Sequence, residues 1–193
     1  MVADATAEVP VNLEAEKGLL GTMLLDNDIA DEVLSRVGEA VFYTDPHQLV
    51  FRAIETLRAE RIAVDPITIV ETMRSAGTLE LVGGASYISV LGNSVPTADN
   101  WEHYLRIVQE NAALREIIKG AAEAREHAQA KDKAAAAESL RRTLALAERE
   151  LAVTVAAEAR AYAFQASTTD DPEHLLSRYI NWASSLTDSP VEY

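Results

Sequence analysis

The chain has 193 residues, of which 48% are hydrophobic and 25% are charged, a composition typical of globular rather than disordered proteins. Its 17 basic and 31 acidic residues give a net charge of −14, which disfavours direct binding to nucleic-acid phosphates. The absence of cysteine excludes disulfides and thiolate metal sites, and without a secretory signal or a run of roughly 20 apolar residues we expect a cytoplasmic protein with no membrane segment.

The first half of the chain predicts a compact bundle of short helices. Residues 1–9 are small and acidic, and we expect them to be flexible, followed by a globular helical subdomain over 10–96. Asn12 is a favourable N-cap for a helix that runs to about Leu25, and Asp26 begins the next helix. With only 8 Gly and 6 Pro in the chain, the sequence indicates an all-α fold.

An Asp-Pro pair opens two further helices of this subdomain. Asp45-Pro46 and Asp65-Pro66 each offer an N-cap followed by a proline in the first helical position. Paired glycines favour a loop, so Gly83-Gly84 is predicted to be the loop at which a last short helix begins. Residues 10–95 therefore predict five or six short helices.

A long protruding αα-hairpin is predicted over residues 97–160. Apolar residues recur at helical spacing from Thr97 to about Ala130, and a polar break leads into a second helix. These apolar residues either cover one another within the hairpin or pair with a second hairpin, and their length favours self-association as a dimer. The predicted self-association surface consists of Leu114, Ile117, Ile118, Leu140, Leu144 and Leu151.

The C-terminal part predicts a polar linker over residues 161–171 and an isolated helix over 172–187. A helix this short is marginal in water, so its apolar face needs a surface on which to dock. That face consists of Leu175, Leu176, Tyr179, Ile180, Ala183 and Leu186.

No pattern in the sequence predicts catalysis. A P-loop needs a Gly-Lys pair, and the chain has none. Glu14 and Glu16 point apart at i and i+2, so capping of the first helical turn explains them better than an acid/base pair. The histidines lack the spacing of zinc ligands; they are His47, His103, His127 and His174. We therefore predict no catalytic, cofactor or metal site and no enzymatic activity in this chain.

One ordered set of motifs resembles the N-terminal domain of DnaB-type replicative DNA helicases. The fragments follow one another at the family's spacing from residue 10 to about residue 120. They are Pro10, Asn12, Glu14-Ala15-Glu16, Leu20-Gly21, Leu24-Leu25-Asp26, Phe42-Tyr43, His47, Phe51, Ile54, Asp65, Ile67, Gly77-Thr78-Leu79, Val82-Gly83-Gly84, Tyr87, Leu91, Val95-Pro96-Thr97, Asn100, Tyr104, Ile107-Val108 and Arg115.

The resemblance implies an assembly role. In this family the domain forms the collar of a hexamer built as a trimer of dimers, with DNA contacted only indirectly, through the ring. In the family, the collar binds primase. The linker helix, which corresponds to residues 172–187 here, packs on the motor domain of the adjacent subunit. Helicase loaders approach the same linker and motor region. ATP and Mg²⁺ belong to the motor domain rather than to this part of the protein.

The family's motor domain is expected to start near Val191, in the stretch 188–193. We therefore expect the chain to be part of a longer helicase. The alternative is a stand-alone adaptor or inhibitor without a motor, which joins or binds a replicative helicase.

Overall fold

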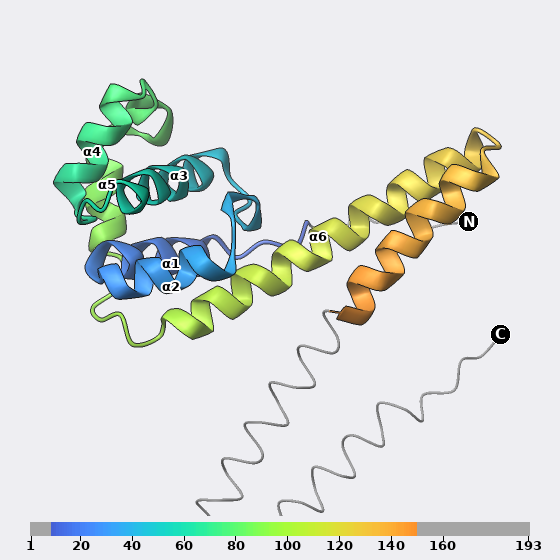
Figure 1. Ribbon diagram of the computed structural model, residues 1–193, viewed down its shortest axis with the longest axis horizontal. Helices are drawn as coiled ribbons and strands as arrows, with labels where there is room; N and C mark the ends of the chain where they lie inside the picture. The colour runs from blue at the N-terminus through green and yellow to red at the C-terminus, as the bar shows by residue number, and fades with distance from the viewer. Residues whose placement is uncertain (1–8, 150–193) are drawn as a thin grey trace, which may run out of the picture.

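The computed structural model describes residues 9–149, and every regular element in this range is a helix (Figure 1). The predicted all-α fold is therefore confirmed. The elements are α1 (Leu13–Leu25), α2 (Asn27–Arg36), the 3-10 turn η1 (Glu39–Val41), α3 (Asp45–Ala59), α4 (Pro66–Ser75), the 3-10 turn η2 (Leu79–Val82), α5 (Gly84–Gly92), α6 (Trp101–Gln129) and a further helix over 133–149. The predicted linker 161–171 and the predicted helix 172–187 lie outside the described residues, as do residues 1–8, 150–160 and 188–193.

Most helices begin at the predicted caps. The Asn12 side chain accepts a hydrogen bond from the Ala15 amide at 3.0 Å, and Asp65 forms a capping box with Thr68. The prediction for Asp45 is wrong by one residue, because Thr44 caps α3 and accepts from the His47 amide at 3.4 Å. Pro46 is therefore the second residue of the helix rather than the first. Its lack of an amide hydrogen is tolerated there, because amides of the first helical turn have no partner within the helix.

Three helices end with the same backbone motif. In each, a residue with left-handed backbone dihedrals follows the helix. The amide of the next residue then donates a hydrogen bond to the carbonyl five residues earlier. The left-handed residues are Arg61 (φ 59°), Gly77 (φ 71°) and Lys131 (φ 61°). The corresponding hydrogen bonds all measure 2.9 Å and run from Ile62 to Leu57, from Thr78 to Met73 and from Asp132 to His127.

Helix α1 is the centre of the globule formed by α1 to α5. It contacts α2, α3, α5 and α6, and an unbroken run from Gly18 to Leu24 is buried. Helices covered on several sides require small residues where a neighbour comes close. A Cβ on Gly18 would lie 3.1 Å from the Tyr104 ring, and one on Gly21 would lie 2.7 Å from the Leu91 carbonyl oxygen.

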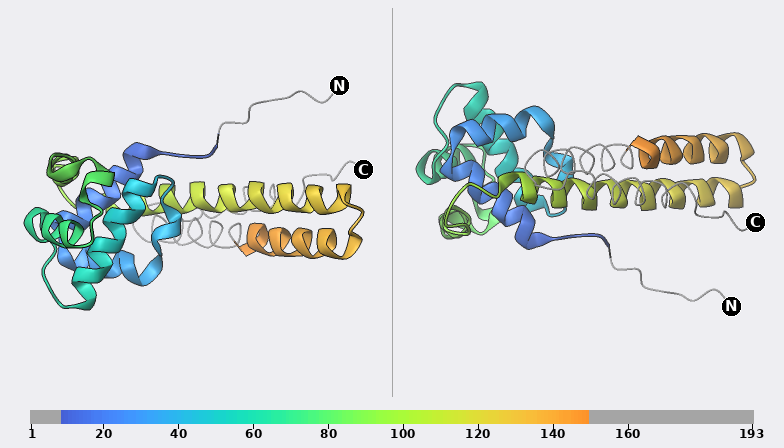
Figure 2. Two further views of the ribbon diagram at one scale, coloured as in Figure 1. Left: turned by 90° about the horizontal axis from the view of Figure 1, so that it is seen from above. Right: turned by 90° about the horizontal axis from the view of Figure 1, so that it is seen from below.

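Helix α6 begins on the globule and continues as the first helix of the hairpin, which extends away from the globule (Figures 1 and 2). Its first turns pack on the core through the buried side chains of Leu105 and Val108. The predicted start at Thr97 is wrong, because the helix begins at Trp101. Asp99 and Asn100 lie in a turn instead, a conformation that both residue types favour over a helix interior. None of the helices in residues 9–149 combines the length and hydropathy that a membrane span requires.

Candidate self-association surface

The two helices of the hairpin contact each other through small side chains. Gly120 faces Thr143 so closely that a Cβ on Gly120 would overlap the Thr143 hydroxyl. Further along the pair, Ala124 and Ser139 are buried. Small residues allow two helix backbones to approach closely, so the hairpin closes without burying Leu114, Ile118, Leu140 or Leu144.

Four large aliphatic side chains of the hairpin remain exposed. The side chains of Leu114, Ile118, Leu140 and Leu144 are 49, 51, 56 and 60% exposed. Each pair is spaced i, i+4 and so shares one side of its own helix. The alternative in which these residues cover one another within the hairpin does not hold for these four. Ile117 is half-buried, and Leu151 lies outside the described residues, as does the predicted docking face of the helix 172–187.

The charges around this aliphatic surface nearly cancel. Residues 101–149 contain nine basic and eight acidic side chains, whereas residues 9–100 contain six basic and fourteen acidic ones. Within the hairpin, Arg142 lies 3.8 Å from Glu123 on the opposite helix, and Arg141 lies 3.6 Å from Glu138. A pair of hairpins would therefore experience less like-charge repulsion than a pair of acidic globules.

Arg115 holds the hairpin to the globule. Its guanidinium donates to the Pro10 carbonyl at 3.0 Å and to the Val41 carbonyl at 2.6 Å. It also lies 5.5 Å from the centre of the Tyr43 ring, within the range of a cation–π contact. One side chain thus joins α6, the N-terminal segment and the segment after η1, where the hairpin leaves the globule.

A buried polar network lies inside the globule, and the sequence analysis missed it. Glu16 is buried rather than solvated in the first turn, so its interpretation as a simple capping residue is wrong. One carboxylate oxygen accepts from the Tyr43 amide at 2.8 Å, and the other lies 2.5 Å from Nδ1 of His47. Because a carboxylate only accepts, Nδ1 donates this bond.

The network continues to Tyr87. Nε2 of His47 lies 2.7 Å from the Tyr87 hydroxyl, and burial raises the pKa of that hydroxyl above its ordinary value. Burial thus keeps the proton on this hydroxyl, which shares a hydrogen bond with Nε2. Helical spacing gave a signal for Glu16, which precedes the buried residues Leu19 and Leu20 by three and four positions, but no local pattern pointed to His47.

No arrangement for metal binding occurs in the part of the chain that the structure describes. There, no group of three or more His, Asp or Glu side chains converges as metal ligands do. The Glu16–His47 pair is bound to Tyr43 and Tyr87 instead, and this accounts for its polar atoms. Within residues 9–149 the hairpin surface is therefore the main candidate for function.

Comparison with known proteins shows the family of the chain. The family model described as the DnaB-like helicase N terminal domain matches residues 8–110, which is more than half of the chain. The chain belongs to this DnaB family. The structure of the N-terminal domain of DnaB helicase from Mycobacterium tuberculosis is 35% identical, with a TM-score of 0.64 over 71% of this chain and 96% of that one.

Two further relatives place this domain within longer proteins. The chain is 37% identical over 112 residues to the replicative DNA helicase DnaB of Buchnera aphidicola subsp. Baizongia pistaciae, covering 58% of this chain and 24% of that protein. The chain thus spans about a quarter of the length of this DnaB relative. A solved DnaB-like replicative helicase, described with its interactions with primase, shares the fold with a TM-score of 0.60 at 22% identity, over 72% of this chain and 34% of that one.

The structure also explains the motifs on which the resemblance to DnaB rests. Glu16, Tyr43, His47 and Tyr87 come from four separate motifs and meet in one buried network. Arg115, the last motif residue, joins the first motif through the Pro10 carbonyl. Motifs that are far apart in the sequence are therefore parts of the same set of contacts.

Proposed function

We propose that the chain is the oligomerisation and partner-docking domain of a hexameric replicative DNA helicase. In this function the domain forms the collar of the ring, with pairs of subunits joined through their hairpins. The chain itself performs no catalysis, and ATP and Mg²⁺ act in a motor domain of the parent helicase. DNA is contacted only indirectly, through the ring.

The observation that carries this proposal is the exposed aliphatic surface of the hairpin. Leu114, Ile118, Leu140 and Leu144 are large, exposed and grouped at i, i+4 spacing, while small residues close the hairpin itself. Isologous pairing with a second copy would bury this surface on both partners at once. Fully burying an exposed side chain of this size contributes about 1.5–3 kcal/mol. These four are already about half covered, so each would contribute part of that value on each partner against the cost of association.

Three kinds of partner complete the proposal. Primase is the first, supported by the solved relative that is described with its interactions with primase. The motor domain of the adjacent subunit is the second and receives the helix 172–187. A helicase loader that approaches the same region is the third.

The proposal is tested by measuring the molar mass of the purified chain over a range of concentrations by light scattering. We expect dimers or larger assemblies that dissociate on dilution. Leu144→Asp should raise the dissociation constant at least about tenfold, because an unpaired charge in an apolar interface costs several kcal/mol. A chain that stays monomeric at high concentration would contradict the proposal.

The matched control is Ala145→Asp. Ala145 is also exposed, but it points about 100° away from Leu144 around the helix. It introduces the same charge and should leave assembly nearly unchanged. Equal loss of assembly in the two variants would mean that acidity, rather than the aliphatic surface, controls self-association.

The alternative function is a stand-alone adaptor or inhibitor that joins or binds a replicative helicase without contributing a motor. The exposed hairpin surface serves this function equally well. The gene sequence downstream of Tyr193 separates the two functions, since an in-frame P-loop supports the helicase domain and a stop codon supports the adaptor. ATP turnover by the purified chain would contradict both.

A further inference from the structure

The segment 41–43, which consists of the last residue of η1 and the two residues after it, is bound to three different helices through its backbone. Each of its residues contributes one backbone hydrogen bond, and the three bonds lead to α6, α3 and α1. They run from Arg115 to the Val41 carbonyl at 2.6 Å, from Gln48 to the Phe42 carbonyl at 2.9 Å and from the Tyr43 amide to Glu16 at 2.8 Å. The side chain of Phe42 is buried. This short segment therefore joins the base of the hairpin to the interior of the globule.

The bond from Arg115 acts on α6 at some distance from the core. Val108 is the last residue of α6 that belongs to the core of the globule. Arg115 lies about 10 Å further along the helix, at a rise of about 1.5 Å per residue. The helix continues to Gln129, about 30 Å beyond Val108, so a displacement at Arg115 becomes about three times larger at the tip of the hairpin. The contacts of Arg115 therefore control the direction in which the hairpin leaves the globule.

The position of the segment 41–43 depends in turn on the buried network. Glu16, which accepts from the Tyr43 amide, is bound to His47 at 2.5 Å, and His47 is bound to Tyr87 at 2.7 Å. Glu16 and His47 are buried, so the loss of one partner leaves a polar group poorly satisfied and disturbs the next contact. Tyr87 is half-buried on α5 and is the end of this series of contacts. An uninterrupted series thus runs from α5 to the base of the hairpin.

We propose that the buried network sets the direction of the hairpin, with the segment 41–43 as the element that transmits its position to Arg115. A change at Tyr87 then loosens the Tyr43 amide, the Val41 carbonyl moves relative to α6, and the hairpin tip changes direction. Helix α5 and the hairpin tip lie at opposite ends of the molecule (Figure 1). The series of contacts therefore couples two regions that do not touch each other, which is the requirement for control of one region from the other.

This inference goes beyond the proposed function, because it concerns the geometry of a single chain and holds whether or not the hairpins pair. Self-association is measured by molar mass, whereas the direction of the hairpin is measured by a distance within one chain. A failure of one therefore leaves the other intact.

The test measures the distance between the globule and the hairpin tip in the full chain. Because the chain contains no cysteine, Glu55→Cys on α3 and Lys133→Cys near the tip introduce two unique sites for spin labels, and both residues are exposed. Double electron–electron resonance gives the distribution of label distances, with excess unlabelled chain added so that only distances within one chain contribute. Arg115→Ala should broaden this distribution, because α6 then loses its contacts with Val41 and Pro10.

Tyr87→Phe is the decisive variant, because it deletes one hydroxyl at the far end of the series and keeps the ring. We expect a broader distance distribution and roughly five- to tenfold faster hydrogen exchange at the Tyr43 amide, as for the loss of about one hydrogen bond. The matched control is Tyr104→Phe, which removes the same atom from α6 itself, outside the series of contacts. It should leave both measurements unchanged.

The double variant Tyr87→Phe/Arg115→Ala tests whether the effect passes through Arg115. If it does, Tyr87→Phe should broaden the distribution no further once Arg115 is removed, because the change no longer reaches α6. Additive broadening in the double variant would overturn the proposal. An unchanged distribution in Tyr87→Phe, or equal effects of Tyr87→Phe and Tyr104→Phe, would also overturn it.

Discussion

The globule and the hairpin use the same kind of element in opposite ways. In the globule, α1 is buried by four other helices, and the large aliphatic and aromatic side chains fill a shared core. In the hairpin, small residues such as Gly120 and Ala124 lie between the helices, while Leu140 and Leu144 face outward. The globule therefore buries most of its large apolar side chains in a core of its own, although Ile67 and Leu81 stay exposed, whereas the hairpin does not cover Leu140 and Leu144.

The largest expected effect tests whether the globule depends on its buried network. His47→Ala removes the donor to the Glu16 carboxylate and leaves that charge buried without its partner. Such a loss costs about 3–5 kcal/mol in the free energy of unfolding, which urea denaturation followed by circular dichroism measures. His103→Ala, at an exposed position of α6, should change it little. Equal effects of both variants would mean that the buried network does not stabilise the globule.

A somewhat smaller effect is expected where α1 approaches the segment after α5. In Gly21→Ala, the new methyl group would lie 2.7 Å from the Leu91 carbonyl oxygen and also meet the Ser94 hydroxyl. Overpacking of this kind costs about 1–3 kcal/mol, measured as a lower urea midpoint. Gly38→Ala is the control, because a Cβ there meets no atom within 4 Å. Unchanged stability in Gly21→Ala would show that α1 is packed more loosely than the structure indicates.

The junction between the two regions is tested with Arg115→Ala. This change removes two hydrogen bonds from a guanidinium to carbonyls, together with its contact on Tyr43, and should cost about 2 kcal/mol. Hydrogen exchange should quicken at residues 41–43, whose amides are hydrogen-bonded in the segment that Arg115 joins to α6. Arg125→Ala, on the exposed part of α6, should leave this segment protected. Faster exchange only in the hairpin would contradict the role of Arg115 as a junction.

A single methyl group probes the contact within the hairpin. Gly120→Ala should separate the two helices, because its Cβ overlaps the Thr143 hydroxyl, but alanine also favours the helix over glycine by about 0.5–1 kcal/mol. Adding Thr143→Ala removes the overlap and keeps that gain. We therefore expect the double variant to be more thermally stable than the unmodified chain and the single variant to be less so. An equal melting temperature for both variants would mean that Gly120 is not needed for close approach.

The smallest effect compares the two regions at matched helix ends. Arg61 in the globule and Lys131 at the end of the hairpin both have a positive φ, which glycine adopts without strain. Arg61→Gly and Lys131→Gly should each stabilise the chain by about 0.5–1 kcal/mol, measured by urea denaturation. Arg125→Gly, inside a regular helix, is the control and should destabilise.

Local features of the fold were predictable from the sequence, and features that depend on distant residues were not. Asn12 and Asp65 cap their helices by bonding to amides three residues away, so short spacing contains the information. The role of Glu16 depends on His47, 31 positions further along the chain. Neighbouring residues alone therefore place the Glu16 carboxylate in a solvated first turn of the helix.

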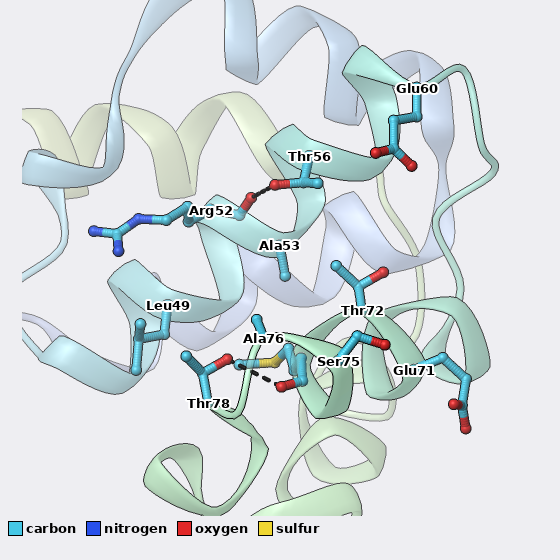
Figure 3. A pocket seen from close by; sticks show the side chains of 11 residues that line it. Leu49, Arg52, Ala53, Thr56, Glu60, Glu71, Thr72, Ser75, Ala76 and Thr78 are labelled. Atoms are coloured by element: carbon cyan, nitrogen blue, oxygen red, sulfur yellow. Dashed lines mark hydrogen bonds between the residues drawn. The ribbon is translucent and has the colours of Figure 1, made fainter.

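The hairpin surface shows the same limit at the level of packing. Helical spacing identified Leu140 and Leu144 as an apolar stripe, but spacing alone does not tell which stripe faces the neighbouring helix. The contact between Gly120 and Thr143 decides this, and it pairs residues of two different helices. An open groove between α3 and α4, lined among others by Leu49, Ala53 and Met73 (Figure 3), was likewise absent from the predictions, because it arises where two helices pack together rather than from a motif in either one.

The central position of α1 has a consequence for how the protein is made. α1 leaves the ribosome well before α6, yet part of its cover comes from α6, through Leu105 and Val108. The globule therefore cannot close until more than half of the chain has been synthesised, and α1 must wait with apolar surface uncovered. Contacts between such distant segments slow folding and expose nascent chains to aggregation, so the period before α6 emerges is the one in which aggregation threatens this domain.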